Sequence, residues 1–313
     1  MSRPVRFRVV EPEDGTLLPN LLSRRLPDVD LAAAKELVRA GAVYVGHLRV
    51  RLNTIRVATG ERITVYPDAL GKEGLETDAL RFVHRDPDFV VLDKPAGVPV
   101  AQTRDSARGT LSEALRRALE EEGVLRPYVG VVHRLDQGAS GLVLLTIRGV
   151  ANKSLHRQFA EHEIERRYRV RLLGEPPAAL RCEEPLVELK HGRVRVARSG
   201  EPRARPALTE LRRLEPVVTE VDGQAAALME VELHTGRTHQ IRVHAQALGF
   251  PVLGDRKYGA RDDDEPARLY LHADRLAFAH PSTGERIELR APRPEWARAT
   301  DDEQPPARGR VLP

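Results

Sequence analysis

The sequence is poor in the residues that stabilise secreted proteins or span membranes. One cysteine, Cys182, excludes a disulfide within the chain, and no Cys/His cluster has zinc-site spacing. Apolar stretches are far shorter than the roughly 20 residues that a membrane-spanning helix needs, and the start MSRPVRFRVVEPEDG lacks the apolar segment of a signal peptide. We therefore expect a cytoplasmic protein with no membrane association.

Aromatic residues and net charge are also scarce. Aromatics make up 4% of the 313 residues, and 50 Lys and Arg against 46 Asp and Glu leave a formal charge of +4. Because so small an excess attracts polyanions only weakly, an anionic partner requires a local basic patch. The length suffices for a large domain with a smaller one beside it.

The N-terminal region predicts a small module of helix followed by strands. In DLAAAKELVRAGAV, residues 30–43, Asp30 is a natural N-cap and Gly41 a natural stop. Its apolar positions follow helical spacing at Leu31, Ala34, Leu37 and Val38. Two alternating runs, VYVGHLRV and ERITVY, read as strands. We expect an arm over residues 1–14 and a module over residues 15–67.

The remaining sequence predicts a linker, a large domain and a tail. Residues 68–79 are polar and lack periodicity, as a linker does. From residue 80 to 298 strand and helix patterns mix without a regular βαβ period, which favours an α+β domain built on a mixed, largely antiparallel sheet. The polar segment 299–313 is expected to be disordered.

The stretch HRLDQGASGL, residues 133–142, places charged residues directly before small ones. Asp136 follows an apolar strand pattern, and Arg134 lies on the same side of the chain if the segment is extended. One reading is a structural ion pair between these two, and the other is a reactive carboxylate presented by a loop. The small residues that follow allow either a flat ligand or a tightly packed strand to approach.

A second dense stretch, LHTGRTHQIRVHAQALGFPVLGDRKYG, covers residues 233–259. His234, His239 and His244 are five residues apart, which does not align them on one helical face, so we expect no metal site. The cationic side chains here and on an upstream strand form either a local RNA-binding surface or a solvated charged face. They are Arg237, Arg242, Arg256, Lys257, Arg166, Arg167 and Arg169.

These stretches resemble one family, the RNA pseudouridine synthases of the large-subunit-rRNA and tRNA type (RluA-type). HRLDQGASGL resembles its HRLD-x-x-[TA]-SGL signature, and DKPAGVPV, ERRYRVRLLG, TGRTHQIRVHAQALGFPVLGDRKYG and LYLHADRLAFAHPSTGE resemble its other blocks, in family order over residues 80–294. LVRAGAVYVGHLRV and GERITVY resemble an S4 RNA-binding domain. The resemblance implies a pseudouridine synthase catalytic domain with a central RNA-binding cleft, preceded by an S4-like module.

The resemblance also implies roles for individual residues. Asp136 takes the place of the nucleophilic carboxylate, Arg242 of its guanidinium partner, and Tyr168 of the aromatic that stacks on the target base. Arg134 takes the place of a side chain that fills the gap left by the flipped nucleotide. The residues expected to contact RNA are Arg134, His133, Arg166, Arg237, His239 and Gln240.

The implied reaction fits these residue types. Converting uridine to pseudouridine replaces an N-glycosidic by a C-glycosidic bond within one nucleotide, so we expect no cofactor and no metal. Asp136 attacks either C6 of the base or C1′ of the sugar, and the sequence leaves both open. A base within folded RNA must be flipped out, and stacking on an aromatic side chain offsets part of that cost. The expected partner is rRNA or tRNA, and the expected state is a monomer.

Two other functions remain possible from the sequence. A catalytically silent RNA-binding protein on the same scaffold would have lost the carboxylate or its arginine, yet Asp136 and Arg242 are both present. A metal-dependent nuclease would use the histidines and the acidic run Asp262–Asp264, which reads more simply as a surface turn.

Overall fold

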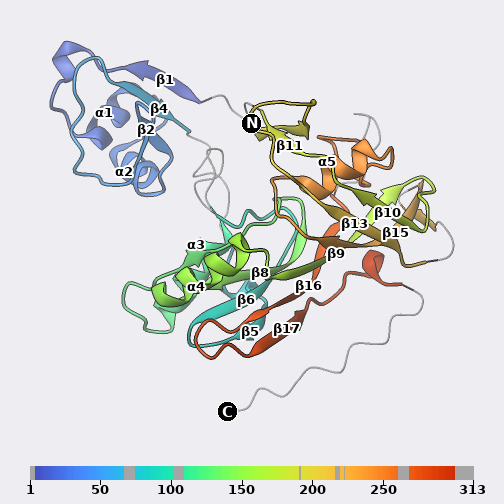
Figure 1. The fold of residues 1–313 in the computed structure, drawn as a ribbon. Coiled ribbons are helices and arrows are strands. Elements are labelled where there is room, and N and C mark those ends of the chain that lie inside the picture. Colours follow the sequence, from blue (N-terminus) through green and yellow to red (C-terminus); the bar gives the residue numbers. More distant parts are fainter. Residues whose placement is uncertain are drawn as a thin grey trace. The chain divides into compact units, whose positions relative to one another are not determined.

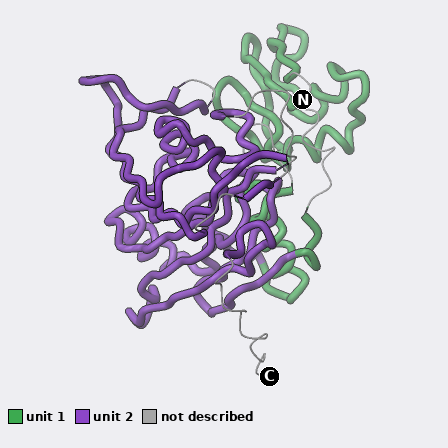
Figure 2. The backbone as a smooth tube through the Cα atoms, turned by 90° about the vertical axis from the view of Figure 1, so that its right-hand side faces the viewer, with its two compact units in different colours: residues 1–79, 99–125 green, residues 80–98, 126–313 purple. Residues whose placement is uncertain are grey.

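The computed structural model describes residues 4–66, 75–101, 109–189, 192–215, 219–221, 223–259 and 268–299. The chain forms two units, one of residues 1–79 with 99–125 and one of residues 80–98 with 126–313 (Figure 2). The domain boundaries expected at residues 15, 67, 80 and 298 stay a prediction. Apart from Ala299, the predicted tail lies outside the described residues, as does the first part of the predicted linker.

The first unit packs two short helices against a four-stranded antiparallel sheet of order β1-β4-β2-β3 (Figure 1). The apolar core of this unit includes Leu18, Leu22, Leu37 and Ile63, all fully buried. Its elements are β1 (Val5–Arg8), α1 (Leu18–Arg25), α2 (Leu31–Arg39), β2 (Val43–Val45), β3 (Leu48–Val50) and β4 (Arg62–Val65), with a 3-10 turn at Glu11–Glu13.

Helix α2 begins and ends as the sequence predicts, and one strand was not predicted. The Asp30 carboxylate accepts a hydrogen bond from the Ala33 amide at 2.7 Å, and Gly41 has the positive φ of 70° that a helix stop favours. Leu31, expected on the apolar face, is exposed because it lies at the first helical position. Within residues 15–67 the prediction of helix first and strands second is confirmed, whereas β1, in the expected arm, was not predicted because it is defined by its pairing with the distant β4.

Helix α3 (Leu111–Glu121) also belongs to the first unit. The Thr110 hydroxyl caps it by accepting from the Glu113 amide at 3.2 Å. Arg117 donates to the Leu75 carbonyl just before the 3-10 turn Thr77–Ala79. This bond ties α3 to the chain that leads into the second unit.

The second unit is built on an 11-stranded sheet whose main path is β10-β13-β15-β9-β16-β8-β6-β5 (Figure 1). β16 pairs with β8 in parallel, and the other described pairs of this sheet are antiparallel. The mixed, sheet-rich α+β architecture confirms the predicted class. Its strands are β5 (Phe82–Arg85), β6 (Phe89–Lys94), β7 (Gly130–Val131), β8 (Ser140–Thr146), β9 (Glu165–Leu173), β10 (Ala179–Cys182), β13 (Thr209–Arg213), β14 (Thr219–Val221), β15 (Gln224–Leu233), β16 (Leu271–Ala279) and β17 (Arg286–Arg290).

Two helices and a separate hairpin accompany this sheet. The helices are α4 (Gly149–Ala160) and α5 (Gln240–Ala247), and the hairpin is β11 (Leu186–Glu188) with β12 (Val194–Val196). A 3-10 turn at Glu295–Ala297 follows β17. Within the part of the chain that the structure describes, no helix combines the length and apolar character needed to cross a membrane.

The small residues after Asp136 are explained by close strand packing. Gly141 has a φ of +104°, and a Cβ there would collide with the backbone of Ala273 on β16. Ser140 and Gly141 are the residues through which β8 pairs with β16 in parallel. Of the two possibilities that the sequence left open, the structure therefore supports a tightly packed strand at Gly141.

Candidate active site

Asp136 lies in the loop between β7 and β8, and its side chain is 19% exposed. Its Oδ2 atom accepts a hydrogen bond from Arg242 Nη1 at 2.8 Å, in the first turn of α5. Among the described residues no other hydrogen bond reaches this carboxylate. The structure thus brings together two residues from separate motifs and leaves one carboxylate oxygen, Oδ1, available.

Arg242 is held in place by a second carboxylate, that of Asp255. Its Nε and Nη2 atoms donate to the two oxygens of Asp255, each at 2.7 Å, in a bidentate pair. Asp255 is fully buried and also accepts from the backbone amides of Lys257 and Tyr258. Burial alone would lower the pKa of Arg242, but the bonds and charges of Asp255 and Asp136 outweigh it and raise that pKa.

His239 lies on the other side of the carboxylate. Its Nε2 atom is 3.9 Å from Asp136 Oδ1, and its Nδ1 atom is 2.7 Å from the Tyr258 hydroxyl. That hydroxyl also accepts from the Val194 amide at 3.0 Å, which links the ring to β12. Burial lowers the pKa of His239, while the charge of Asp136 opposes that shift, so the ring is neutral at neutral pH.

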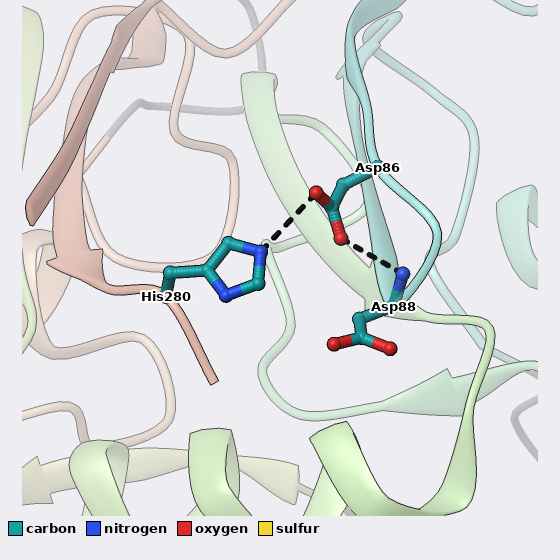
Figure 3. Close-up of side chains that lie close together, drawn as sticks. All are labelled: Asp86, Asp88 and His280. Carbon is teal, nitrogen blue, oxygen red and sulfur yellow. Dashed lines mark hydrogen bonds and ion pairs between the residues drawn. The ribbon is translucent and has the colours of Figure 1, made fainter. Parts of the chain in front are cut away.

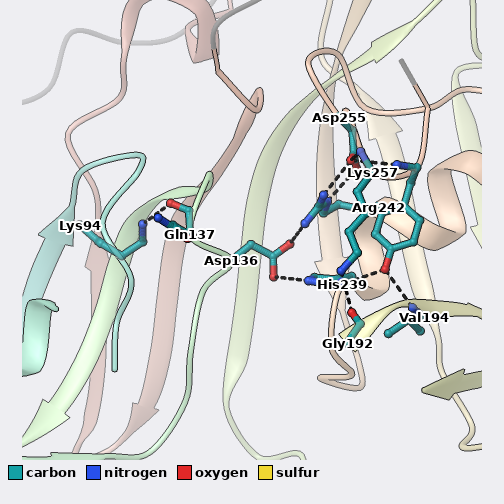
Figure 4. Close-up of polar contacts among 10 residues, drawn as sticks. Lys94, Asp136, Gln137, Gly192, Val194, His239, Arg242, Asp255 and Lys257 are labelled. Carbon is teal, nitrogen blue, oxygen red and sulfur yellow. Dashed lines mark hydrogen bonds and ion pairs between the residues drawn. The ribbon is translucent and has the colours of Figure 1, made fainter. Parts of the chain in front are cut away.

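Lys94 holds the loop that carries Asp136 from the opposite side (Figure 4). It is fully buried and donates to the carbonyls of Pro95, Val98 and Gln137 at 2.9, 2.7 and 3.1 Å. Burial lowers its pKa to about 7, and the charge of Asp136 opposes that shift. With three N–H groups given to three carbonyls, the ammonium fixes the backbone directly after Asp136.

Tyr168 and Arg166 occupy one face of β9. Tyr168 is 7% exposed and lies opposite Val231 and Ala273 in the sheet. Burial raises its pKa, and the nearby charge of Asp136 adds to that effect. The Arg166 guanidinium lies 5.7 Å from the centre of the Phe159 ring. The residues predicted to surround the base are thus in the same part of the unit as Asp136.

The other residues expected to contact RNA differ in their surroundings. Arg134 is exposed. His133 accepts from the Leu144 amide at 2.9 Å and stacks on Phe159, and burial lowers its pKa to about 3. Gln240 is buried, and its amide donates to the carbonyl of Leu208. These bonds engage His133 and Gln240 within the protein, and their RNA contacts stay a prediction.

Arg167 and Arg169 do not join the cationic surface suggested for them. Successive side chains of a strand point to opposite faces, so these two lie on the other side of β9 from Tyr168. Arg167 pairs with Glu230 at 3.1 Å, and Arg169 is buried 3.7 Å from Asp274. The suggestion was wrong for both because it counted charges without following the alternation of the strand.

The three histidines of the second stretch bond to separate partners. His234 Nε2 is 3.0 Å from Glu210, and His244 is buried between the Thr209 hydroxyl and the Glu184 carbonyl. His239 is the one that lies beside Asp136, as described above. The acidic run Asp262–Asp264 of the nuclease hypothesis lies outside the described residues.

Asp86, Asp88 and His280 form another polar cluster, between the β5–β6 turn and the end of β16 (Figure 3). His280 Nε2 is 3.2 Å from Asp86, and its Nδ1 atom accepts from the amides of Ser282 and Thr283 at 3.1 Å. Because Nδ1 accepts, Nε2 carries the proton and donates a hydrogen bond to the Asp86 carboxylate. Both ring nitrogens are thereby used, and we assign the cluster a structural role.

Four residues of the Asp136 surroundings were missed from the sequence. Asp255, Tyr258 and the backbone of Val194 were given no role, and Lys94 was seen only as part of the DKPAG stretch. The signal for Asp255 and Tyr258 was their place in GDRKYG, within the same block as Arg242. The signal for Lys94 was a lysine at the end of an apolar run that predicts a buried strand.

Comparisons with known proteins agree on one family. A family model described as RNA pseudouridylate synthase matches residues 88–247. An uncharacterised RNA pseudouridine synthase of Aquifex aeolicus is 31% identical over 94% of this chain and 95% of its own length. The ribosomal large subunit pseudouridine synthase D of Neisseria meningitidis serogroup B is 33% identical over 90% of this chain and 76% of its own. The solved structure of human RNA pseudouridylate synthase domain containing 1 is 28% identical, with a TM-score of 0.59, over 71% of this chain and 87% of that one.

Proposed function

This chain belongs to the RNA pseudouridine synthase family and is an isomerase that acts on RNA, and from that premise we propose that Asp136 is its nucleophile. The observation that carries the proposal is that Asp136 accepts a hydrogen bond from the described residues through one oxygen only. Arg242 holds Oδ2 at 2.8 Å, while Oδ1 accepts no hydrogen bond from the described residues. A carboxylate fixed in this way is oriented and charged, with a free oxygen to attack.

The reaction rearranges bonds within one nucleotide. The C1′–N1 bond of uridine breaks, a C1′–C5 bond forms, and the proton on C5 is lost while N1 gains one. Attack of Asp136 Oδ1 on either C6 or C1′ would hold one fragment while the base turns. The second oxygen stays on Arg242, which carries its charge throughout because Asp255 fixes the other edge of the guanidinium.

We propose that the target uridine is flipped out of the RNA to reach this carboxylate. Tyr168, on β9, supplies the stacking surface for the flipped base, worth roughly 1–3 kcal/mol. The exposed Arg134, two residues before Asp136, enters the space that the base leaves in the RNA. Lys94 and His239 act as positioning residues. Lys94 bonds to the loop that carries Asp136, and His239 lies beside the Asp136 carboxylate.

We propose large-subunit rRNA as the first substrate to test, because relatives named ribosomal large subunit pseudouridine synthase D match most of this chain. tRNA is the second substrate to test.

Residues 15–67 are proposed to bind RNA as an S4-like module, with a central cleft in the larger domain holding the target strand. The cytoplasmic location and the monomeric state stay predictions.

The direct test is to map pseudouridine in the organism's RNA. Carbodiimide-based mapping of rRNA and tRNA from a strain lacking the gene and from its parent should show at least one uridine modified only in the parent. Expression of the wild-type protein in the deletion strain should restore that position. Identical maps of the two strains would contradict the proposed function.

The competing function is RNA binding without catalysis. It would predict that the purified protein binds large-subunit rRNA but forms no pseudouridine in it. The intact pairing of Asp136, Arg242 and Asp255 favours catalysis, because a binding protein has no use for a partly exposed carboxylate held by one oxygen. Incubation of purified protein with unmodified transcript separates the two functions.

A further inference from the structure

A basic cavity lies beside the proposed catalytic carboxylate, and only its wall of Gly236, Arg237 and Thr238 belongs to a motif that resembles the family. It encloses about 340 Å³ in the second unit. The hairpin of β11 and β12 forms one wall, the segment with Arg203 and Arg205 a second, and the loop before α5 a third. The lining residues are Leu186, Glu188, Val194, Arg203, Arg205, Gly236, Arg237 and Thr238.

The floor of this cavity is apolar and well packed. Leu186 and Val194 belong to a buried cluster that also contains Val243 of α5 and Tyr258. Val194 donates its amide to the Tyr258 hydroxyl at 3.0 Å. The hairpin is therefore anchored to α5, and the cavity between them is part of the folded unit.

The rim of the cavity gathers positive charge. Arg203 and Arg205 are exposed, and neither guanidinium forms an ion pair with a carboxylate of the described residues. Arg237 donates one bond, to the Pro206 carbonyl at 3.1 Å. Burial lowers the pKa of Arg237, and the charges of Arg205 and Arg166 lower it further. Like charges held this close favour an anion between them.

Glu188 is the only acidic residue of the lining, and it faces three arginines, so the described lining keeps a net charge of +2. The Glu188 side chain is exposed. The Arg166 guanidinium lies against Gly236 of the lining, so closely that a Cβ at Gly236 would collide with it. The absence of a side chain lets Arg166 reach the loop that closes the cavity.

The side chain of His239 lies between the cavity and the Asp136 carboxylate. Thr238 of its wall precedes His239, whose Nε2 atom is 3.9 Å from Asp136 Oδ1. Val194 of its floor bonds to Tyr258, which contacts the same imidazole at 2.7 Å. A nucleotide strand with its uridine at Asp136 would place a neighbouring backbone group within reach of this cavity.

We propose that the cavity binds a phosphodiester group of the substrate RNA next to the target uridine, with Arg203 and Arg205 supplying the charge. This inference rests on the proposed function and adds two residues that no family motif contains. Arginine suits the role because its planar donors match phosphate oxygens. The contact would fix the RNA strand while the base turns at Asp136. It would raise the affinity for RNA independently of the RNA sequence.

The test is the salt dependence of RNA binding by the double variant R203Q/R205Q. The probe is an unmodified transcript of large-subunit rRNA. Each phosphate contact contributes about 0.7 to the slope of log Kd against log salt for single-stranded RNA. We expect a slope shallower by roughly that amount and a Kd that is about 10-fold weaker at low salt.

Matched variants control for net charge. R286Q/R290Q removes two arginines from β17, which lies at the far end of the second unit from β11 (Figure 1), and it should leave slope and activity as in the wild type. R203K/R205K keeps the charge and should keep most of the slope. Thermal unfolding of each variant should match the wild type, since all four side chains are on the surface.

The outcomes separate this proposal from the proposed function. An R203Q/R205Q slope equal to that of the wild type overturns the phosphate site, even if the wild type forms pseudouridine. A reduced slope with no pseudouridine formed by the wild type keeps the phosphate site and overturns the function. If inorganic phosphate binds the wild type but not R203Q/R205Q while the RNA slope is unchanged, the cavity is a small-anion site and the RNA contact is refuted.

Discussion

Asp136 and Asp274 both pair with arginine in the second unit, yet their oxygens are used differently. Asp274 is 4% exposed and accepts from Arg293 through both oxygens, at 2.6 and 3.1 Å, with Arg169 at 3.7 Å. Asp136 is 19% exposed and accepts from Arg242 through one oxygen. The comparison shows that Asp136 keeps one oxygen without a hydrogen bond from the described residues, whereas both oxygens of Asp274 join segments of the chain.

The difference arises from the partner arginines. Arg242 gives its bidentate edge to Asp255 and has one further N–H for Asp136. Arg293 gives its bidentate edge to Asp274 itself and thereby anchors the chain after β17 to the sheet. Asp255 is thus the counterpart of Asp274, and Asp136 is the additional, accessible carboxylate.

Apart from a change of Asp136 itself, the largest expected effect comes from Arg242→Met. It leaves Asp136 without its charge partner and Asp255 buried without one, so pseudouridine formation should fall by about 10³-fold, or about 4 kcal/mol of barrier. Unfolding should also become easier by about 3 kcal/mol because a buried charge is unpaired. Single-turnover rates and denaturant unfolding measure the two effects.

A second variant separates these effects. Arg242→Met combined with Asp255→Asn removes the unpaired buried charge and keeps an acceptor for the Lys257 and Tyr258 amides, so it should recover stability without recovering activity. Recovery of both would show that Arg242 acts only through folding.

Asp274→Asn should give the next largest effect, on stability alone. Arg293 and Arg169 lose a buried negative partner, and the free energy of unfolding should fall by about 3 kcal/mol. The rate per folded molecule should stay within about twofold of the wild type, because Asp274 lies on the face of the sheet opposite Tyr168. A large loss of rate in the folded fraction would break the distinction between the two carboxylates.

His272, on the same face as Asp274, should make stability depend on pH. Burial lowers its pKa from 6.5 to about 4, and Asp274 opposes that shift. Between these values the unfolded chain binds more protons than the folded one, so stability should rise with pH from 4 to 6.5 and level off above. His272→Gln should flatten this rise by about 3 kcal/mol in total, as read from unfolding curves at several pH values. An unchanged rise would assign it to other groups, of which His133 has the same sign.

The smallest effect is expected for an exposed ion pair. Arg157 on α4 and Glu161 at its C-cap are 2.7 Å apart, but their side chains are 58% and 49% exposed. Glu161→Gln should change the free energy of unfolding by less than about 0.5 kcal/mol, since water screens the pair. A loss near that of Asp274→Asn would mean that burial does not decide the worth of an ion pair in this protein.

Local signals in the sequence predict much of the fold. The cap at Asp30, the stop at Gly41 and the buried run of β6 follow from side-chain chemistry within a few residues. β1 and the hairpin β11–β12 were missed because their short runs become strands only through distant partners. The exposure of Leu31 depends on where its helix begins relative to the core, which periodicity does not show.

The site divides in the same way. Motif resemblance pointed to Asp136 and Arg242, and the fold brings them within 2.8 Å. It could not reveal that Lys94 donates to three backbone carbonyls, because one of these bonds, to Gln137, spans 43 residues of chain. Nor could it separate Arg166 from Arg169, since that requires knowing which face of β9 meets the RNA side.

The central claim concerns the free oxygen of Asp136, and Asp136→Asn tests it most directly. The variant keeps the shape of the side chain and a hydrogen-bond acceptor for Arg242, so stability should change by less than about 1 kcal/mol and RNA affinity by less than about threefold. Pseudouridine formation under single-turnover conditions should fall by more than about 10⁴-fold, whereas the exposed control Asp78→Asn should match the wild type. Turnover by Asp136→Asn at a rate comparable to that of the wild type would contradict the account.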